Sequence, residues 1–277
     1  MTGILLAAVA AVVVGSGDFL GGLAGRRTEP WSVVGTGFLA GTVVMSLIAA
    51  MVGGQPTAAD LGWGAASGAG GAAGVYLLYR GFSRAPMGVV SPLAAVLGGL
   101  VPASAGLLTG DAVSVTMALG MGIGLVAIIL VSWVPVAVSE AVWVGVRHGI
   151  GAGLGFGFLL LFLARAGRDA GLWPVLVSRA ASFAILALAS GILGRSLFVS
   201  RKALVPALAA GVLTVLGNAG YVLALNLGSL APVSIVYSLF PASTVVLAWL
   251  VFRERLRPGQ AVGVGLALLG TALITVG

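Results

Sequence analysis

Charged residues divide this chain into ten long apolar runs, and this division constrains the fold more than any other feature. An α-helix needs about 20 apolar residues to cross the hydrocarbon core of a bilayer. Hydrophobic residues make up 60% of the chain and charged residues only 8%, whereas soluble domains carry about 25% charged residues. Such a chain needs lipid as its solvent. The expected spans are approximately residues 3–23, 31–53, 61–79, 86–108, 113–134, 148–164, 172–193, 203–225, 229–252 and 258–276.

The runs are expected to be helices, which gives an all-α integral membrane fold. Backbone groups left without partners are costly in lipid, and a helix satisfies its own. The alternating pattern of barrel strands is missing. The 45 glycines suit close packing of helices in a bilayer. No Lys or Arg precedes the first run, so we expect a retained span rather than a signal peptide.

The second half of the chain repeats the first. Residues 71–90 and 217–236, which are offset by 146, share eight identical residues in twenty, and further matches follow in the same order along the chain. The eight pairs are Gly71/Gly217, Ala73/Ala219, Gly74/Gly220, Leu77/Leu223, Ser83/Ser229, Ala85/Ala231, Pro86/Pro232 and Val90/Val236. A search for internal repeats therefore divides the chain into one copy over 1–134, a linker over 135–147 and a second copy over 148–277.

The odd number of spans in each copy predicts an inverted repeat. After five spans the second copy enters the bilayer from the opposite side, so the expected fold is ten transmembrane helices arranged as two inverted five-helix repeats. Repeats of this kind are related by a pseudo-two-fold axis in the membrane plane, and their substrate sites lie near the midplane between them. The sequence thus predicts alternating access.

The chain resembles the EamA family of the drug/metabolite transporter superfamily over its whole length. The resemblance rests on the two five-span halves, on GSGDFLGGLAGRR at the end of the first run and on APVSIVYSLFPASTVVLAWLVFRERLRPGQAVGVGLALLGTALI near the C-terminus. In that family an acidic residue ends the fourth span of each half and a glycine-rich fifth span follows. The matching residues are Asp111, where Glu is usual, and Glu254. The resemblance implies export of small organic molecules and leaves the substrate open.

Two charges lie within the apolar runs. Asp18 is in the first run, and an Asp at a helix centre costs roughly 2.5–3.5 kcal/mol. Such residues usually face a cavity or a partner, so Asp18 is a candidate for substrate binding and for carrying a coupling proton. Arg179, seven residues into its run, is a candidate for binding an anionic group or neutralising Asp18. The alternatives are an Asp18 that meets headgroup water and an Arg179 that snorkels to the interface.

A polar and aromatic set completes the candidate substrate site. Asn218 and Tyr221 are three residues apart and share one helix face. Their counterparts in the first copy are Ala72 and Val75, so the second copy is more polar at this face. The alternative role is hydrogen bonding between helices, worth about 0.6 kcal/mol on average. The set consists of Tyr76, Tyr79, Asn218, Tyr221 and Tyr237.

Prolines interrupt corresponding spans of the two copies. Pro92 and Pro102 fall inside the fourth run and Pro241 inside the ninth. Each removes a backbone donor and kinks a helix. Interrupted helices at matching places in two repeats are typical of moving, cavity-lining elements, which makes these three prolines candidate hinges. The alternative is a static kink filled by packing.

Several classes of function are excluded by the residues. The net charge of +7 comes from basic residues scattered at the ends of runs, not from a patch that would bind nucleic acid. The chain has no cysteine and one histidine, His148, so we expect no disulfide and no metal site. The glycines are not followed by Gly-Lys-Ser/Thr, so we expect no nucleotide site and no cofactor. Catalytic constellations are missing, so an enzyme is not expected.

The expected protein is a secondary transporter of the cytoplasmic membrane that exports small organic metabolites or drugs. Its partners would be the substrate and the lipid bilayer, and a coupling proton is a further candidate. Two other classes remain open. A non-transporting scaffold or sensor subunit predicts that Asp18, Asn218 and Tyr221 pack against helices without an aqueous cavity. A lipid flippase predicts a lateral opening and dependence on a lipid head group.

Orientation is predicted differently by charge and by resemblance. Eleven of the 14 Lys and Arg residues lie at odd-numbered connections and two at an even-numbered one. The positive-inside rule then places the odd connections in the cytoplasm and both termini outside. The family resemblance implies termini inside. A reporter fused to the C-terminus decides between them.

Overall fold

The computed structural model describes the chain except for residues 26–27, 83, 86, 133–139 and 253–256. The described residues form helices and contain no strand, as a chain in lipid requires. The helices are α1 (Thr2–Gly25), α2 (Pro30–Val52), α3 (Ala58–Phe82), α4 (Met87–Leu108), α5 (Val115–Ser132), α6 (Glu140–Leu163), the short 3-10 helix η1 (Arg168–Ala170), α7 (Trp173–Leu193), α8 (Arg201–Leu225), α9 (Leu230–Tyr237), α10 (Phe240–Phe252) and α11 (Pro258–Val276).

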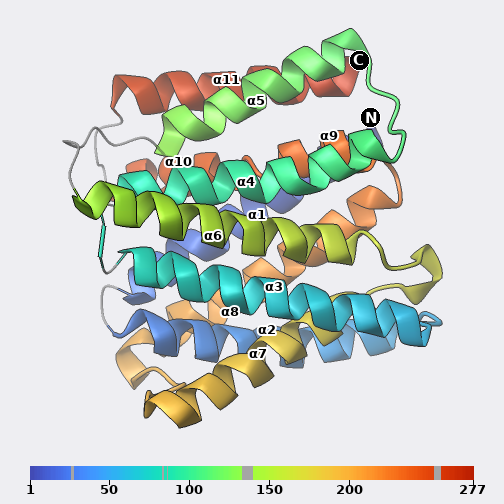
Figure 1. Ribbon diagram of the computed structural model, residues 1–277. Helices are drawn as coiled ribbons and strands as arrows, with labels where there is room; N and C mark the ends of the chain where they lie inside the picture. The colour runs from blue at the N-terminus through green and yellow to red at the C-terminus, as the bar shows by residue number, and fades with distance from the viewer. Residues whose placement is uncertain (26–27, 83, 86, 133–139, 253–256) are drawn as a thin grey trace.

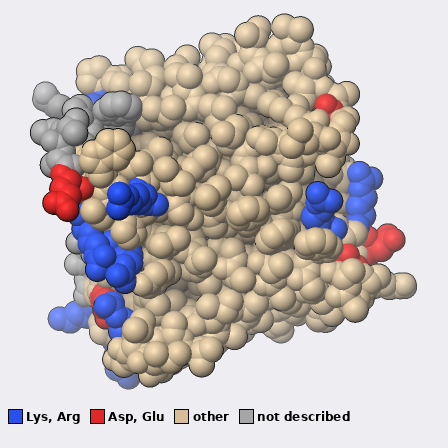
Figure 2. Space-filling model, viewed as in Figure 1, with Lys and Arg blue, Asp and Glu red and all other residues tan. Residues whose placement is uncertain are grey.

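The helices lie side by side with their ends at two opposite faces (Figure 1). Both termini lie at one of these faces, which we call the terminal end. The opposite face, at which α2, α8 and α11 begin, holds Arg84, Arg195 and Arg201, and we call it the basic end. Figure 2 shows the charged side chains gathered at these two faces, with an almost uncharged band between them. This band is the surface that lipid covers.

The lipid-facing surface is visible on α1. Leu5, Val9 and Val12 are each more than half exposed and form one stripe along the helix, while Ala7 and Ala10 on the other side are buried. Among the described residues, eight segments are long and apolar enough to cross a membrane: seven single helices and the segment Leu230–Val251, which contains α9 and most of α10. Residues 92–108 of α4 form a shorter apolar segment. The chain is therefore a multi-pass membrane protein. This supports eight of the ten expected spans by length and composition.

The ninth expected span, 229–252, is divided into α9 and α10. The division falls at Ser238 and Leu239, immediately before Pro241. Proline has no N–H to donate to the carbonyl four residues earlier, so the carbonyl of Tyr237 loses its helical partner. In the first copy α4 remains a single helix across Pro92 and Pro102. The fourth span of the first copy is therefore continuous, whereas the corresponding span of the second copy is divided.

Helices from different copies pack closely against each other. The contacts between α1 and α8, α2 and α8, α3 and α6, and α5 and α11 are among the most extensive in the protein. Glycines bring the backbones together: a Cβ added at Gly211 of α8 would overlap the backbone of Gly37 in α2, and a Cβ at Gly155 of α6 would lie 2.7 Å from Gly74 of α3. The two copies thus form one interlocked bundle rather than two separate bodies.

Candidate functional site

A cavity of about 520 Å³ lies inside the bundle, and both copies line it. Its wall extends from Val14 and Asn218, in the middle of α1 and α8, to Gly22, Val33 and Gln260 near the basic end. All the long helices contribute lining residues, α9 by its last residue. The cavity therefore runs from the middle of the bundle towards the basic end.

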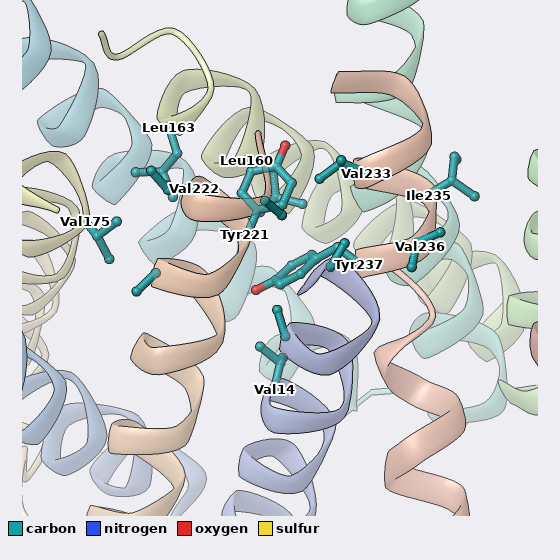
Figure 3. Packing of buried hydrophobic residues seen from close by; sticks show 14 of the residues in the cluster. Val14, Leu160, Leu163, Val175, Tyr221, Val222, Val233, Ile235, Val236 and Tyr237 are labelled. Atoms are coloured by element: carbon teal, nitrogen blue, oxygen red, sulfur yellow. The ribbon is translucent and has the colours of Figure 1, made fainter. Parts of the chain in front are cut away.

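The terminal end of the bundle is filled by buried hydrophobic side chains. The largest core cluster contains Ile4 of α1, Leu163 of α6 and Ala224 of α8, each at most 5% exposed and close to that end of its helix. Figure 3 shows the part of this cluster around Tyr221 and Tyr237. Beyond it, a smaller cavity of about 190 Å³ lies beside the link between α6 and α7. The structure is thus hollow towards one end and closed at the other.

Both charges predicted in the apolar runs line the central cavity. Asp18 of α1 is exposed to the cavity. Arg179 of α7 is only 6% exposed, and its guanidinium lies over the ring of Phe38, with Cζ 5.4 Å from the ring centroid. Asp18 and Arg179 are close enough to interact electrostatically. Within the described part of the chain, no salt bridge joins them, and the ion pair that is present links Arg195 to Glu29.

Asn218, Tyr221 and Tyr237 lie together at the inner end of the cavity. The Tyr237 hydroxyl donates to Asn218 Oδ1 at 2.6 Å, and the Tyr221 and Ser234 hydroxyls are 2.9 Å apart. The two tyrosine rings pack with centroids 4.9 Å apart. Asn218 and Tyr237 line the cavity, whereas Tyr221 is fully buried behind them. Tyr221 therefore holds α8 to α9 and is out of reach of a ligand in this conformation.

Tyr76 lies away from the cavity lining. It is 36% exposed, accepts a hydrogen bond from Arg80 Nη1 at 2.6 Å and meets the ring of Trp31 edge-on. The side chain of Tyr79 is outside the described residues. Of the candidate hinges, Pro241 lines the cavity, while Pro92 and Pro102 are buried in α4 and do not. The tertiary structure thus brings together Asp18, Arg179, Asn218, Tyr237 and Pro241.

Sequence analysis missed a set of hydroxyl and amide side chains in the cavity wall: Ser178, Ser182, Thr214, Thr244 and Gln260. Ser178 and Ser182 are four residues apart and share a face of α7, a spacing that was visible in the sequence. Their hydroxyls are used between helices. Ser178 lies 3.0 Å from the hydroxyl of Ser67, and Ser182 donates to the carbonyl of Gly68. They therefore attach α7 to α3 of the other copy.

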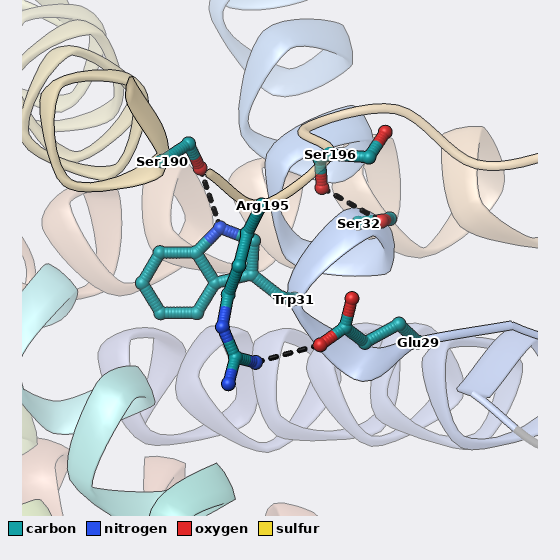
Figure 4. Close-up of polar contacts among 6 residues, drawn as sticks. All are labelled: Glu29, Trp31, Ser32, Ser190, Arg195 and Ser196. Atoms are coloured by element: carbon teal, nitrogen blue, oxygen red, sulfur yellow. Dashed lines mark hydrogen bonds and ion pairs between the residues drawn. The ribbon is translucent and has the colours of Figure 1, made fainter. Parts of the chain in front are cut away.

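Polar contacts join the two copies at the basic end, beside the cavity (Figure 4). Trp31 Nε1 donates to Ser190 Oγ at 2.5 Å, and Ser32 Oγ donates to the carbonyl of Ser196 at 2.8 Å. Arg195 pairs with Glu29 at 2.6 Å, and both side chains are about half exposed. An exposed pair of this kind contributes about 0–1 kcal/mol. These contacts connect the start of α2 to the end of α7.

The structure describes one of the two acids that the family resemblance implied. Glu254 is outside the described residues. Asp111, in the link between α4 and α5, accepts a hydrogen bond from the backbone N–H of Ala231 at 2.7 Å. This N–H belongs to the first turn of α9, where helical N–H groups have no partner inside the helix. Asp111 of the first copy therefore caps a helix of the second.

Removing this cap is expected to destabilise the protein. Loss of a capping side chain costs about 0.5–2 kcal/mol, which corresponds to a fall in apparent Tm of roughly 1–8 °C for a chain of this size. Asp111→Ala should show this fall in a thermal unfolding assay on purified protein. Asp169→Ala is the matched control, because Asp169 is an exposed acid on another link at the same end. Equal Tm values for the two variants would contradict the capping role.

Comparison with known proteins identifies a family and a fold. The model of the EamA-like transporter family matches residues 1–133 and again 143–276. No curated protein matches the chain in sequence. A crystal structure described only as that of a protein is similar with a TM-score of 0.78 and 15% identity, covering 99% of this chain and 96% of that chain. At this identity the similarity concerns the fold.

Proposed function

We propose that this chain, which belongs to the EamA-like transporter family, is a secondary carrier that exports a small organic metabolite or drug across the cytoplasmic membrane. One observation carries the proposal. The cavity between the two copies extends towards the basic end, while packed side chains close the terminal end. A carrier in a conformation that is open to one side of the membrane has this asymmetry. Transport by alternating access also requires a second conformation, in which the open and closed ends are exchanged.

An inverted repeat gives a physical route to this exchange. Five spans in each copy place the copies in opposite orientations, so each can adopt the conformation of the other and reverse the open side. Ten spans return the chain to the face on which it began. The position of both termini at one end supports this arrangement (Figure 1). The break between α9 and α10, which has no match in α4, is where we propose that the two copies change shape relative to each other.

The energy for transport would come from an ion or substrate gradient, because the sequence has no nucleotide-binding motif. Asp18 is the residue proposed to carry a coupling proton. It is an acid within the membrane helix α1, and its side chain is exposed to the cavity. Ionisable residues placed in this way mark proton and substrate pathways in membrane proteins.

The test of alternation uses the absence of cysteine from the natural sequence. Thr244 lines the cavity, whereas Ser234 is fully buried in the closed half. We expect Thr244→Cys to react with a membrane-impermeant maleimide added at the basic end. We expect Ser234→Cys to react with reagent added at the terminal end, slowly, whenever the carrier passes through its other conformation. Reaction rates are measured on each face of oriented membranes.

The parent protein without cysteine and Ser67→Cys are the controls. Ser67 is fully buried and does not itself line the cavity, since its hydroxyl lies behind the lining residues Leu159 and Ser178 and contacts them. A Ser234→Cys that stays as unreactive as Ser67→Cys under all conditions would favour the static scaffold over the carrier.

A further inference from the structure

We propose that the substrate is an organic acid with an apolar body, and that Arg179 binds its anionic group in the central cavity. This inference rests on the proposed carrier function and specifies its substrate class. It follows from the state of the guanidinium, from the side chains around it and from the remaining wall of the cavity.

Arg179 is a buried cation that has no hydrogen-bonded partner among the described residues. It is 6% exposed, and its Nε is fully enclosed with no acceptor. Within the described residues, neither a hydrogen bond nor a salt bridge to Arg179 is present. A buried charge without such a partner is costly to the protein. Membrane proteins keep such residues for ligand and ion pathways, so the missing acceptor points to a ligand that supplies it.

The surroundings of Arg179 position the guanidinium and leave its N–H donors free. Phe38 of α2 lies beneath it at 5.4 Å, and a cation–π contact stabilises the charge without using a hydrogen bond. The neighbouring hydroxyls of Ser178 and Ser182 are directed to groups of α3 and α7. The fork of a guanidinium fits a carboxylate through two parallel hydrogen bonds. The site is therefore prepared for an anion.

Asp18 does not replace the ligand. It shares the cavity with Arg179 but makes no salt bridge with it. The side chain of Asp18 is accessible from the cavity, whereas Arg179 is almost completely enclosed. Arg179 has lost its hydration on burial without gaining a hydrogen-bonded partner, so a ligand lowers the free energy of Arg179 more than that of Asp18. This difference favours an anion on Arg179 over a cation on Asp18.

The other walls of the cavity determine the body of the substrate. Val14 of α1, Val33 of α2, and Phe156 and Leu159 of α6 line it together with small residues. Apolar walls with a few well-placed polar groups are typical of sites for small organic ligands. Tyr237 and Asn218 at the inner end are already paired with each other. The expected substrate has one anionic group and an apolar remainder.

The test is a binding measurement on purified protein in nanodiscs, by isothermal titration calorimetry. The probes are 3-phenylpropanoate and octanoate, each beside the alcohol and the amine with the same carbon skeleton. We expect at least one carboxylate to bind about 10-fold or more tighter than its alcohol, because hydrogen bonds to a charged group contribute about 1.5–3 kcal/mol. Tighter binding of the amines, or equal binding of acids and alcohols, would overturn the proposal.

Variants assign the effect to Arg179. Arg179→Gln should remove the preference for the acid, and Arg179→Lys should keep part of it because the charge remains and the fork is lost. Arg165→Gln, which changes an exposed arginine on the link between α6 and α7, is the matched control and should bind as the parent does. Undiminished acid binding in a folded Arg179→Gln protein contradicts the assignment.

This measurement is independent of transport. A protein whose Ser234→Cys variant never reacts is not an alternating carrier, even if Arg179 binds acids. A protein that alternates but shows no preference for acids keeps the carrier function and loses the substrate class proposed here.

Discussion

Asp18→Asn is expected to abolish transport driven by a pH gradient. Asn has nearly the shape of Asp but cannot take up or release a proton, so the variant keeps the cavity and loses the coupling. One proton coupled to a gradient of one pH unit can support roughly ten-fold accumulation of substrate, because a tenfold ratio corresponds to about 1.4 kcal/mol. The parent protein should approach this ratio in sealed vesicles, and Asp18→Asn should not exceed protein-free vesicles.

The measurement compares two modes of flux in the same vesicles. Accumulation is followed with a pH gradient of either polarity, and exchange of labelled for unlabelled substrate is followed without one. Exchange needs binding and alternation but no net movement of protons, so we expect Asp18→Asn to retain it. Asp169→Asn changes an exposed acid outside the cavity and should behave as the parent. Accumulation that survives in Asp18→Asn would assign the coupling to another group.

Gly211→Val is expected to prevent stable packing of α2 against α8. A Cβ at position 211 would overlap the backbone of Gly37, and backbone cannot move aside as a flexible side chain can. Overpacking of this kind costs about 1–3 kcal/mol or more. A cost of about 3 kcal/mol lowers the apparent Tm by roughly 6–12 °C in a chain of this size. We expect at least this fall, or loss of the monodisperse protein peak.

Gly191→Val is the matched control for this substitution. Gly191 lies on α7, another membrane helix, and a Cβ there meets no atom within 4 Å. The same change in composition and hydrophobicity should therefore leave Tm almost unchanged. Size-exclusion chromatography and thermal unfolding in detergent measure both variants. Similar behaviour of Gly191→Val and Gly211→Val would show that the close approach of α2 and α8 is not required for stability.

Composition and the pattern of apolar runs are enough to predict the class of fold. With so few charges the chain has only lipid as a solvent, and lipid leaves the backbone no choice but helices. The repeat, the family and the position of most helices followed from patterns along the chain. The missing N–H of proline made Pro92, Pro102 and Pro241 equal candidates for an interruption, and the structure divides the helix only beside Pro241 among these three. The sequence further indicated that Asp18 and Arg179 were unusual, since charges in lipid are costly wherever they occur.

Which of these residues share a site depends on how the helices pack and could not be read from the chain. Tyr76 and Tyr237 looked alike in sequence, yet Tyr237 lines the cavity and Tyr76 pairs with Arg80 outside it. Asp18 and Arg179 are 161 positions apart and belong to different copies, so their meeting depends on how α1 and α7 are rotated in the bundle. That rotation is set by close contacts such as those of Gly217 with Val14 of α1 and of Gly68 with Ser178 of α7. In lipid, where apolar faces look alike, packing determines which face of a helix points inward.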